Sequence, residues 1–161
     1  MQKNRKPTRM KGHDYGVAAM YFITSSVKDN RCVFGKVSEG KMNLNSYGQV
    51  AEEQWHWLKD HYAFLTIPAF VVMPNHVHAI IYIHGKTTHQ KIRPLPQLIS
   101  AYKSRVSARI RELGLHDFCW HRSYYDHLIR NEYSYMNILQ YIRDNPRKWH
   151  QDSLFSKKRS Q

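Results

Sequence analysis

The sequence has few acidic residues, few cysteines and no long apolar segment, and each shortage excludes a class of protein. Its 161 residues contain 12 Asp and Glu against 25 Lys and Arg, a formal net charge of +13. The two cysteines, Cys32 and Cys119, form no CxxC pair, which argues against a zinc knuckle or a disulfide framework. No stretch approaches the roughly 20 apolar residues that span a bilayer, and the basic N-terminus lacks the apolar segment of a secretory signal. We therefore expect a cytoplasmic protein with no membrane partner.

The excess of positive charge predicts a polyanionic partner. Lys and Arg neutralise phosphates and release counterions, and aromatic residues, 13% of the chain, can stack on unpaired bases. Nucleic acid is the partner that these residues favour. A basic composition also occurs in proteins that only bind, so charge identifies no reaction.

The spacing of apolar residues predicts one α+β domain over residues 15–150. β-branched and aromatic runs predict strands, and apolar residues at helical spacing predict helices. In chain order the sequence predicts a strand at 17–27, a hairpin at 31–45, a helix at 46–62, a hairpin at 69–83, a helix at 95–113, an extended segment at 118–130 and a helix at 131–145. This order suits an antiparallel sheet with helices packed on one face, a two-layer sandwich. Residues 1–14 are expected to form a flexible basic N-terminal arm, and residues 151–161 a basic C-terminal tail.

Residues 73–83, MPNHVHAIIYI, place two histidines in a run that otherwise reads as a buried strand. Side chains at i and i+2 of a strand point to one face, so His76 and His78 project together, opposite Val77 and Ala79. Two imidazoles on one face can bind the same metal ion. The alternative is a structural pair that is hydrogen-bonded to neighbouring carbonyl groups. The pattern by itself leaves both interpretations open.

A metal on a basic protein suggests chemistry on a phosphate, and the sequence favours tyrosine as the nucleophile. The chain lacks a P-loop and, near its histidines, the carboxylate clusters of two-metal nucleases. Tyr141 lies beside the apolar stripe of the last predicted helix rather than within it, and Asn145 follows one turn later. The two could share a site as nucleophile and neutral oxygen ligand. On spacing alone, packing and an Asn-Pro helix end remain the alternatives.

Two segments carry a resemblance to a known family. VVMPNHVHAIIYI resembles the HUH motif of the single-tyrosine transposases, the IS200/IS605-like superfamily. YYDHLIRNEYSYMNILQYIRDNPRKW resembles the C-terminal signature of their REP-associated tyrosine transposase branch. The resemblance extends over nearly the whole chain and implies a ferredoxin-like or RRM-like α+β sandwich.

The resemblance also assigns roles to residues. It identifies His76 and His78 as the HUH histidines and Tyr141 as the catalytic tyrosine. Asn145 takes the place of the third metal ligand, which is usually a glutamine in the insertion-sequence enzymes. His127 is an alternative contact to metal or DNA.

The reaction that the resemblance implies is cleavage and rejoining of single-stranded DNA. Tyr141 would attack a phosphate polarised by Mg²⁺ or Mn²⁺, leaving a 5′-phosphotyrosine and a free 3′-hydroxyl. The substrate would be a hairpin or repeat element. Its phosphates would be bound by basic residues, for which the candidates are Lys103, Arg105, Arg122 and Arg130. Insertion-sequence relatives form dimers, so a homodimer stays open.

Two alternatives remain at this stage. The chain could be a non-catalytic DNA- or RNA-binding regulator of the same fold, although such a protein has no need for His76, His78 and Tyr141 together. It could also be a metal-dependent nuclease that uses water as the nucleophile. In that case Tyr141 would be dispensable.

Overall fold

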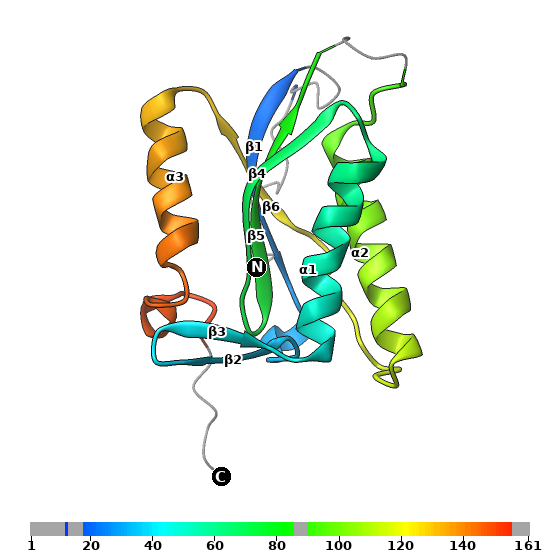
Figure 1. Ribbon diagram of the computed structural model, residues 1–161, viewed down its shortest axis with the longest axis vertical. Coiled ribbons are helices and arrows are strands. Elements are labelled where there is room, and N and C mark those ends of the chain that lie inside the picture. The colour runs from blue at the N-terminus through cyan, green and yellow to red at the C-terminus, as the bar shows by residue number, and fades with distance from the viewer. Residues whose placement is uncertain (1–11, 13–17, 86–89, 156–161) are drawn as a thin grey trace, which may run out of the picture.

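A four-stranded antiparallel sheet forms the centre of the molecule. The structure is a computed structural model that describes Gly12, residues 18–85 and residues 90–155. The strands lie in the order β4-β5-β1-β6, so β5 and β1 are central (Figure 1). Their bounds are β1 Ala19–Ser26, β4 Leu65–Val72, β5 His76–Ile83 and β6 Tyr125–Ile129.

Strand β5 sends its polar side chains to one face of the sheet. Val77 and Ala79 belong to the large apolar core on the opposite face. The imidazoles of His76 and His78 contact each other, with ring centroids 4.6 Å apart. Pairing with β1 places His78 opposite Thr24. The prediction that the two histidines share one face is confirmed.

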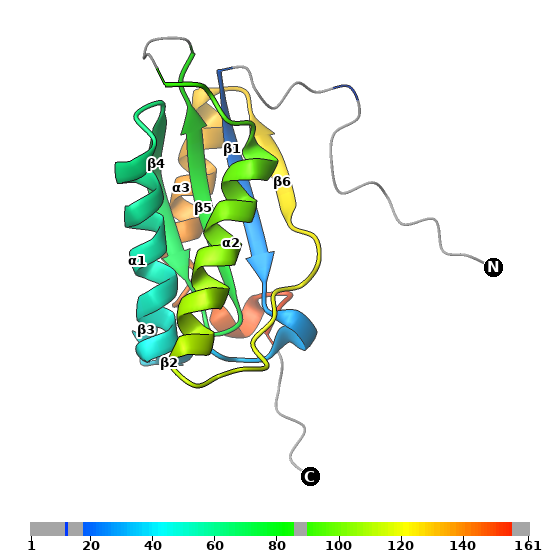
Figure 2. The same cartoon turned by 90° about the vertical axis from the view of Figure 1, so that its right-hand side faces the viewer.

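Helices α1 (Ser46–His61) and α2 (Leu95–Glu112) cover the face of the sheet that lacks these histidines (Figure 2). Trp55 of α1 stacks on Tyr102 of α2 with ring centroids 3.8 Å apart. The Tyr102 hydroxyl donates to the carbonyl oxygen of Ala51 at 2.9 Å, so its buried polar atom is satisfied. This face holds most of the hydrophobic core.

Helix α3 (Glu132–Asp144) covers the other face of the sheet, on the opposite side from α1 and α2 (Figure 1). Leu139 and Ile142 form a smaller core with Ile80 of β5 and Ile129 of β6. The α+β class with an antiparallel sheet is confirmed, but the expectation that all helices pack on one face is wrong. The physical reason is that the central strands are apolar on both faces, so each face needs a cover.

A small hairpin lies across one end of the sheet. Its strands, β2 (Gly35–Ser38) and β3 (Lys41–Leu44), form the predicted hairpin, which is a two-stranded sheet separate from the main one (Figure 1). Gly40 at the turn has a positive φ of 71°, and a Cβ there would lie 3.2 Å from the Arg147 side chain. Glycine at this turn therefore allows the hairpin to approach the segment that follows α3.

The segment after α3 folds back toward the same end of the sheet. Trp149, in a 3₁₀ turn at Trp149–Gln151, is buried, and its ring centroid lies 5.8 Å from that of His76. The folded domain thus continues to Phe155, and the boundary expected at residue 150 is too early.

Residues 156–161 and, apart from Gly12, the proposed N-terminal arm lie outside the described residues. Within the described part, each helix is too short or too polar to cross a membrane.

Candidate metal and tyrosine site

The histidine pair is the centre of the candidate site. His76 Nε2 lies 3.1 Å from His78 Nε2, and the two side chains are almost fully buried. Two ring nitrogens at this separation either share one N–H···N hydrogen bond or present both lone pairs to a cation. The turn that precedes β5 is anchored from two sides, because Val27 N donates to the Asn75 carbonyl at 2.8 Å and Phe34 N to the Pro74 carbonyl at 3.0 Å.

Asn75 selects the tautomer of His76. Its side-chain Nδ2 donates to the carbonyl oxygens of Leu154 at 2.7 Å and Asn30 at 3.2 Å, so its Oδ1 is the accepting end. That oxygen lies 2.8 Å from His76 Nδ1. Nδ1 of His76 therefore carries the proton, and Nε2 offers a lone pair toward His78.

Thr24 permits either tautomer of His78. Its Oγ1 lies 2.8 Å from His78 Nδ1, and a hydroxyl can donate or accept. The pKa of His76 is lowered to about 4, mainly by burial, although Asp152 and the Asn145 side chain oppose this shift. Burial also lowers the pKa of His78, and the neighbouring His76 adds to the effect. Both rings are therefore neutral at pH 7, which is the state in which imidazole binds a metal.

Asp152 is a site residue that sequence reasoning missed. Its Oδ2 lies 3.5 Å from His76 Nε2, and its side chain is 3% exposed. One ligand atom from each of His76, His78 and Asp152 lies within 4.8 Å of the others. The Leu154 N–H donates to Asp152 Oδ1 at 2.8 Å and holds the carboxylate in place. The signal in the sequence was the group of apolar residues Trp149, Leu154 and Phe155, which is unusual for a solvated tail.

Asn145 lies at the same place but remains a predicted ligand. It follows the last residue of α3, is 3% exposed, and donates through Nδ2 to Asp152 Oδ2 at 3.4 Å. Its buried Oδ1 has no hydrogen-bond partner among the described residues. An orphaned amide oxygen, two neutral imidazoles and a carboxylate fit a divalent cation, because a bound ion would satisfy that oxygen and remove the repulsion between facing lone pairs.

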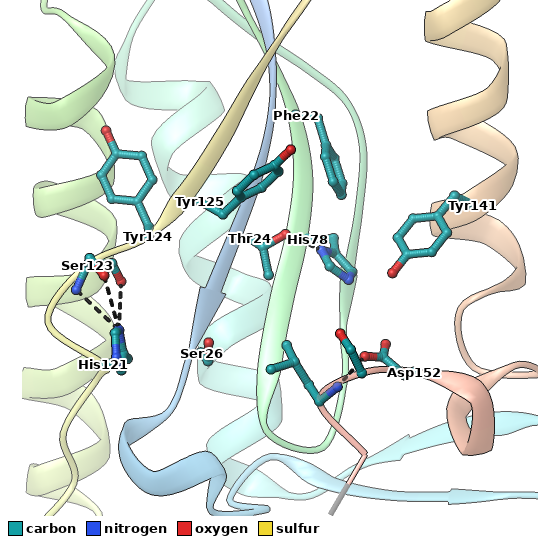
Figure 3. A pocket seen from close by; sticks show the side chains of 12 residues that line it. Phe22, Thr24, Ser26, His78, His121, Ser123, Tyr124, Tyr125, Tyr141 and Asp152 are labelled. Carbon is teal, nitrogen blue, oxygen red and sulfur yellow. Dashed lines mark hydrogen bonds between the residues drawn. The ribbon is translucent and has the colours of Figure 1, made fainter. Parts of the chain in front are cut away.

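Tyr141 faces this donor set from α3. Its hydroxyl points toward His78 and Asp152, and its ring centroid lies 5.3 Å from that of His78 (Figure 3). The side chain is 45% exposed and lines a pocket of about 430 Å³. Burial and then the negative charge of Asp152 raise the pKa of Tyr141, while Asn145 opposes the shift. The tyrosine therefore reaches the histidines of its own chain and is protonated at neutral pH.

The structure does not bring the predicted DNA-binding residues together. The Arg105 guanidinium stacks on Trp57 at 3.6 Å and donates to Gln54 at 2.8 Å. Both partners belong to α1, so Arg105 lies on the face of the sheet opposite to α3 and Tyr141. Lys103 Nζ donates to the His121 carbonyl at 2.8 Å and supports the chain before β6. The exposed side chain of Arg122 lines a separate pocket beside α2.

The remaining two predicted contacts lie near β6. His127 is exposed on this strand and lines a pocket between β6 and α3. Arg130 is exposed directly after the strand. His127 is not in the group of three residues that could share a metal ion, so its role as an alternative metal contact gains no support.

A histidine pair on a central strand, faced by a tyrosine on the helix that covers the same side of the sheet, is the arrangement that the resemblance to the HUH single-tyrosine transposases implies. No family model matches the chain. An uncharacterised protein of Haemophilus influenzae is 33% identical over 168 residues, which cover 94% of this chain and 93% of that protein. A second H. influenzae protein, named as a REP-associated tyrosine transposase, is 25% identical over 145 residues, which cover 84% of this chain and 74% of that protein.

The fold is shared with a solved member of that group. A REP-associated tyrosine transposase bound to a REP hairpin superposes with a TM-score of 0.63 and 20% sequence identity, covering 88% of this chain and 74% of the other. The chain is therefore similar in sequence to one REP-associated tyrosine transposase and shares its fold with another. This relationship supports a role as a transposase.

Proposed function

We propose that the protein is a metal-dependent transposase and endonuclease of single-stranded DNA, in which Tyr141 forms a 5′-phosphotyrosine intermediate. The observation that carries this proposal is the position of the Tyr141 hydroxyl, which points from α3 at a buried pair of neutral imidazoles. A solvent-accessible tyrosine beside a closely held donor set is the arrangement that covalent catalysis on a phosphate needs.

The donor set would hold Mg²⁺ or Mn²⁺ through Nε2 of His76, Nε2 of His78 and one oxygen. Asn145 Oδ1 and Asp152 Oδ2 are the two oxygens that the site offers. A bound divalent ion would supply positive charge to a non-bridging oxygen of the scissile phosphate. Imidazole ligands favour Mn²⁺ over Mg²⁺ in affinity.

The chain's own residues would carry the covalent step. The Tyr141 oxygen bonds to phosphorus as the bond from phosphorus to the 3′-oxygen breaks, and the 3′-oxygen takes a proton from solvent. Because the pKa of Tyr141 is raised, its proton has to leave as the new bond forms. Asp152 is the only carboxylate among the described residues that line the pocket, and the tyrosine hydroxyl points toward it (Figure 3). We assign it the role of proton acceptor.

We further propose a DNA hairpin or repeat element as the substrate, by analogy with the relative that is bound to a REP hairpin. The net charge of +13 supports a polyanionic partner of this kind. The groups to which we assign cleavage all belong to one chain, so this proposal does not depend on a homodimer.

The test is a gel assay with end-labelled single-stranded hairpins from the DNA that flanks the gene. We expect the wild-type protein to form a covalent adduct with Mn²⁺ and none with EDTA, and the Tyr141→Phe variant to form none with either. Strand cleavage that persists in Tyr141→Phe would indicate a water-using nuclease instead. Tight binding without an adduct on any of the hairpins would favour a non-catalytic regulator.

The third ligand can be assigned separately. Asn145→Ala and Asp152→Asn should be compared by Mn²⁺ titration, followed by electron paramagnetic resonance, which needs no DNA. We expect Asn145→Ala to weaken Mn²⁺ binding by 10-fold or more, the usual scale for a disturbed metal site. If only Asp152→Asn does so, the carboxylate is the ligand and its assignment as the proton acceptor is wrong.

A further inference from the structure

A second pocket continues from the tyrosine along the edge of the sheet. It has a volume of about 380 Å³ and lies between β6 and α3. We refer to the space lined by Phe22, Tyr125, His127, Tyr133 and Asn137 as the β6–α3 groove. Phe22 and Tyr125 also line the pocket at Tyr141, so the groove and the proposed site of cleavage are continuous.

The residues that line the groove follow the helical period of α3 on one wall and the two-residue period of β6 on the other. Tyr133, Asn137 and Tyr141 are spaced four residues apart and lie along one side of α3. At 1.5 Å per residue, Tyr133 and Tyr141 are separated by about 12 Å along the helix axis. On the opposite wall, Tyr125 and His127 are both exposed and point to the same face of β6.

Aromatic side chains in the groove are unusually exposed. Tyr133 is 79% exposed and Tyr125 is 55% exposed. The ring of Phe22 lies between those of Tyr125 and Tyr141 (Figure 3). Its centroid is 6.4 Å from that of Tyr125 and 6.0 Å from that of Tyr141, and both contacts are edge to face. Exposed aromatic rings that surround a concave surface mark a binding site rather than a core.

We propose that the β6–α3 groove binds the unpaired bases next to the scissile phosphate, with Tyr125 and Tyr133 stacking on bases. Asn137 and His127 offer hydrogen-bonding groups to base edges. No carboxylate occurs among the described residues that line the groove, which suits a strand of phosphates. A length of about 12 Å accommodates about two or three nucleotides, since stacked nucleotides rise by about 3.4 Å and extended ones by more. This inference rests on the proposed function. It adds that the protein contacts the unpaired bases beside the cleaved bond.

The test compares two ligands of equal charge in EDTA, where no cleavage occurs. One is a fluorescently labelled oligodeoxythymidylate and the other an abasic oligonucleotide of the same length. We expect the wild-type protein to bind the first about tenfold more tightly, because stacking on one or more bases contributes on this scale. Tyr125→Leu and Tyr133→Leu should each lose several-fold of this preference while their affinity for the abasic strand stays unchanged.

Three controls make the comparison specific. Tyr125→Phe keeps the ring and should keep the preference. Met136→Ala removes a side chain of α3 that is 51% exposed and lies outside the lining of either pocket, so it should bind both ligands like the wild type. Circular dichroism should show that each variant is folded.

The inference is overturned if the wild-type protein binds the two ligands equally, or if both leucine variants keep the full preference. A preference for bases without any hairpin adduct would contradict the proposed cleavage and leave the groove assignment intact. A hairpin adduct without a preference for bases would support the proposed cleavage and overturn the groove assignment.

Discussion

The two faces of the sheet are built from different kinds of residue. The face under α1 and α2 buries mostly aromatic and aliphatic side chains, including the stacked pair Trp55 and Tyr102. The face under α3 has a small apolar core at one end and, at the other, buried His76, His78 and Asn145. Burying such polar groups costs free energy, so one face stabilises the fold and the other uses part of that stability to hold a site.

The largest expected change in stability comes from the apolar face. Ile81 points away from His78 on the same strand and is fully buried. Ile81→Ala should lower the free energy of unfolding by about 3 kcal/mol, because it removes apolar contacts and leaves a cavity. Urea denaturation measures this change, with Ile81→Val as the milder control at about 1 kcal/mol. A loss below that of the valine variant would contradict the assignment of this face as the main core.

The next largest expected change in stability depends on pH and comes from the face of the sheet that carries His76. The pKa of His76 is about 4 in the folded protein, against the ordinary histidine value of 6.5 in the unfolded chain, so the unfolded chain binds more protons between these values. Stability is therefore fully present above pH 6.5 and is lost as the pH falls toward 4. In EDTA we expect a loss of about 2 kcal/mol from pH 6.5 to pH 5, at 1.36 kcal/mol for each unit.

His76→Gln provides the control for this pH dependence. It removes the titrating ring, so part of the slope in denaturation midpoint between pH 6.5 and pH 5 should disappear. An unchanged slope would mean that His76 is not held neutral by its burial.

The caps of α1 and α3 allow a smaller, matched comparison. The Oδ1 of Asn45 accepts from Gly48 N at 2.9 Å, and that of Asn131 from Ser134 N at 2.8 Å. Asn45 also donates to the Val33 carbonyl at 2.8 Å, so it ties α1 to the β2 region. Asn131→Ala should cost about 1 kcal/mol and Asn45→Ala about 2 kcal/mol, measured by thermal denaturation. Equal losses would show that the second bond contributes nothing.

The smallest expected change in stability is that of Tyr141→Phe. The side chain is 45% exposed, and the polar neighbour of its hydroxyl is the Asn145 side chain. The unfolding free energy should therefore change by less than about 0.5 kcal/mol, while adduct formation is lost. A large destabilisation would instead identify Tyr141 as a packing residue, the alternative that spacing alone left open.

Local patterns predict much of the fold. The period of two in MPNHVHAIIYI places His76 and His78 on one face, and Asn131 caps α3 as predicted. Tyr141 lies beside the apolar stripe of α3, as its position relative to Ile142 indicates. These features depend on neighbours a few residues away, so sequence periodicity contains them.

Features that depend on distant contacts were harder to predict. The side of the sheet that α3 covers follows from the apolar residues of β1 and β5 together, which no single segment reveals. Asp152 reaches His76 because Asn75 binds the Leu154 carbonyl, a contact between segments that lie far apart in the sequence. Arg105 was predicted to bind DNA from charge alone, and its stacking on Trp57 depends on how α1 packs against α2.

The most direct test of the account is to locate the DNA on the protein. The covalent adduct formed with a hairpin in Mn²⁺ can be digested with nuclease and trypsin and examined by mass spectrometry. The account predicts a phosphotyrosine-linked nucleotide on the peptide that contains Tyr141. Attachment at another residue, or cleavage of the hairpin without any attachment, would contradict it.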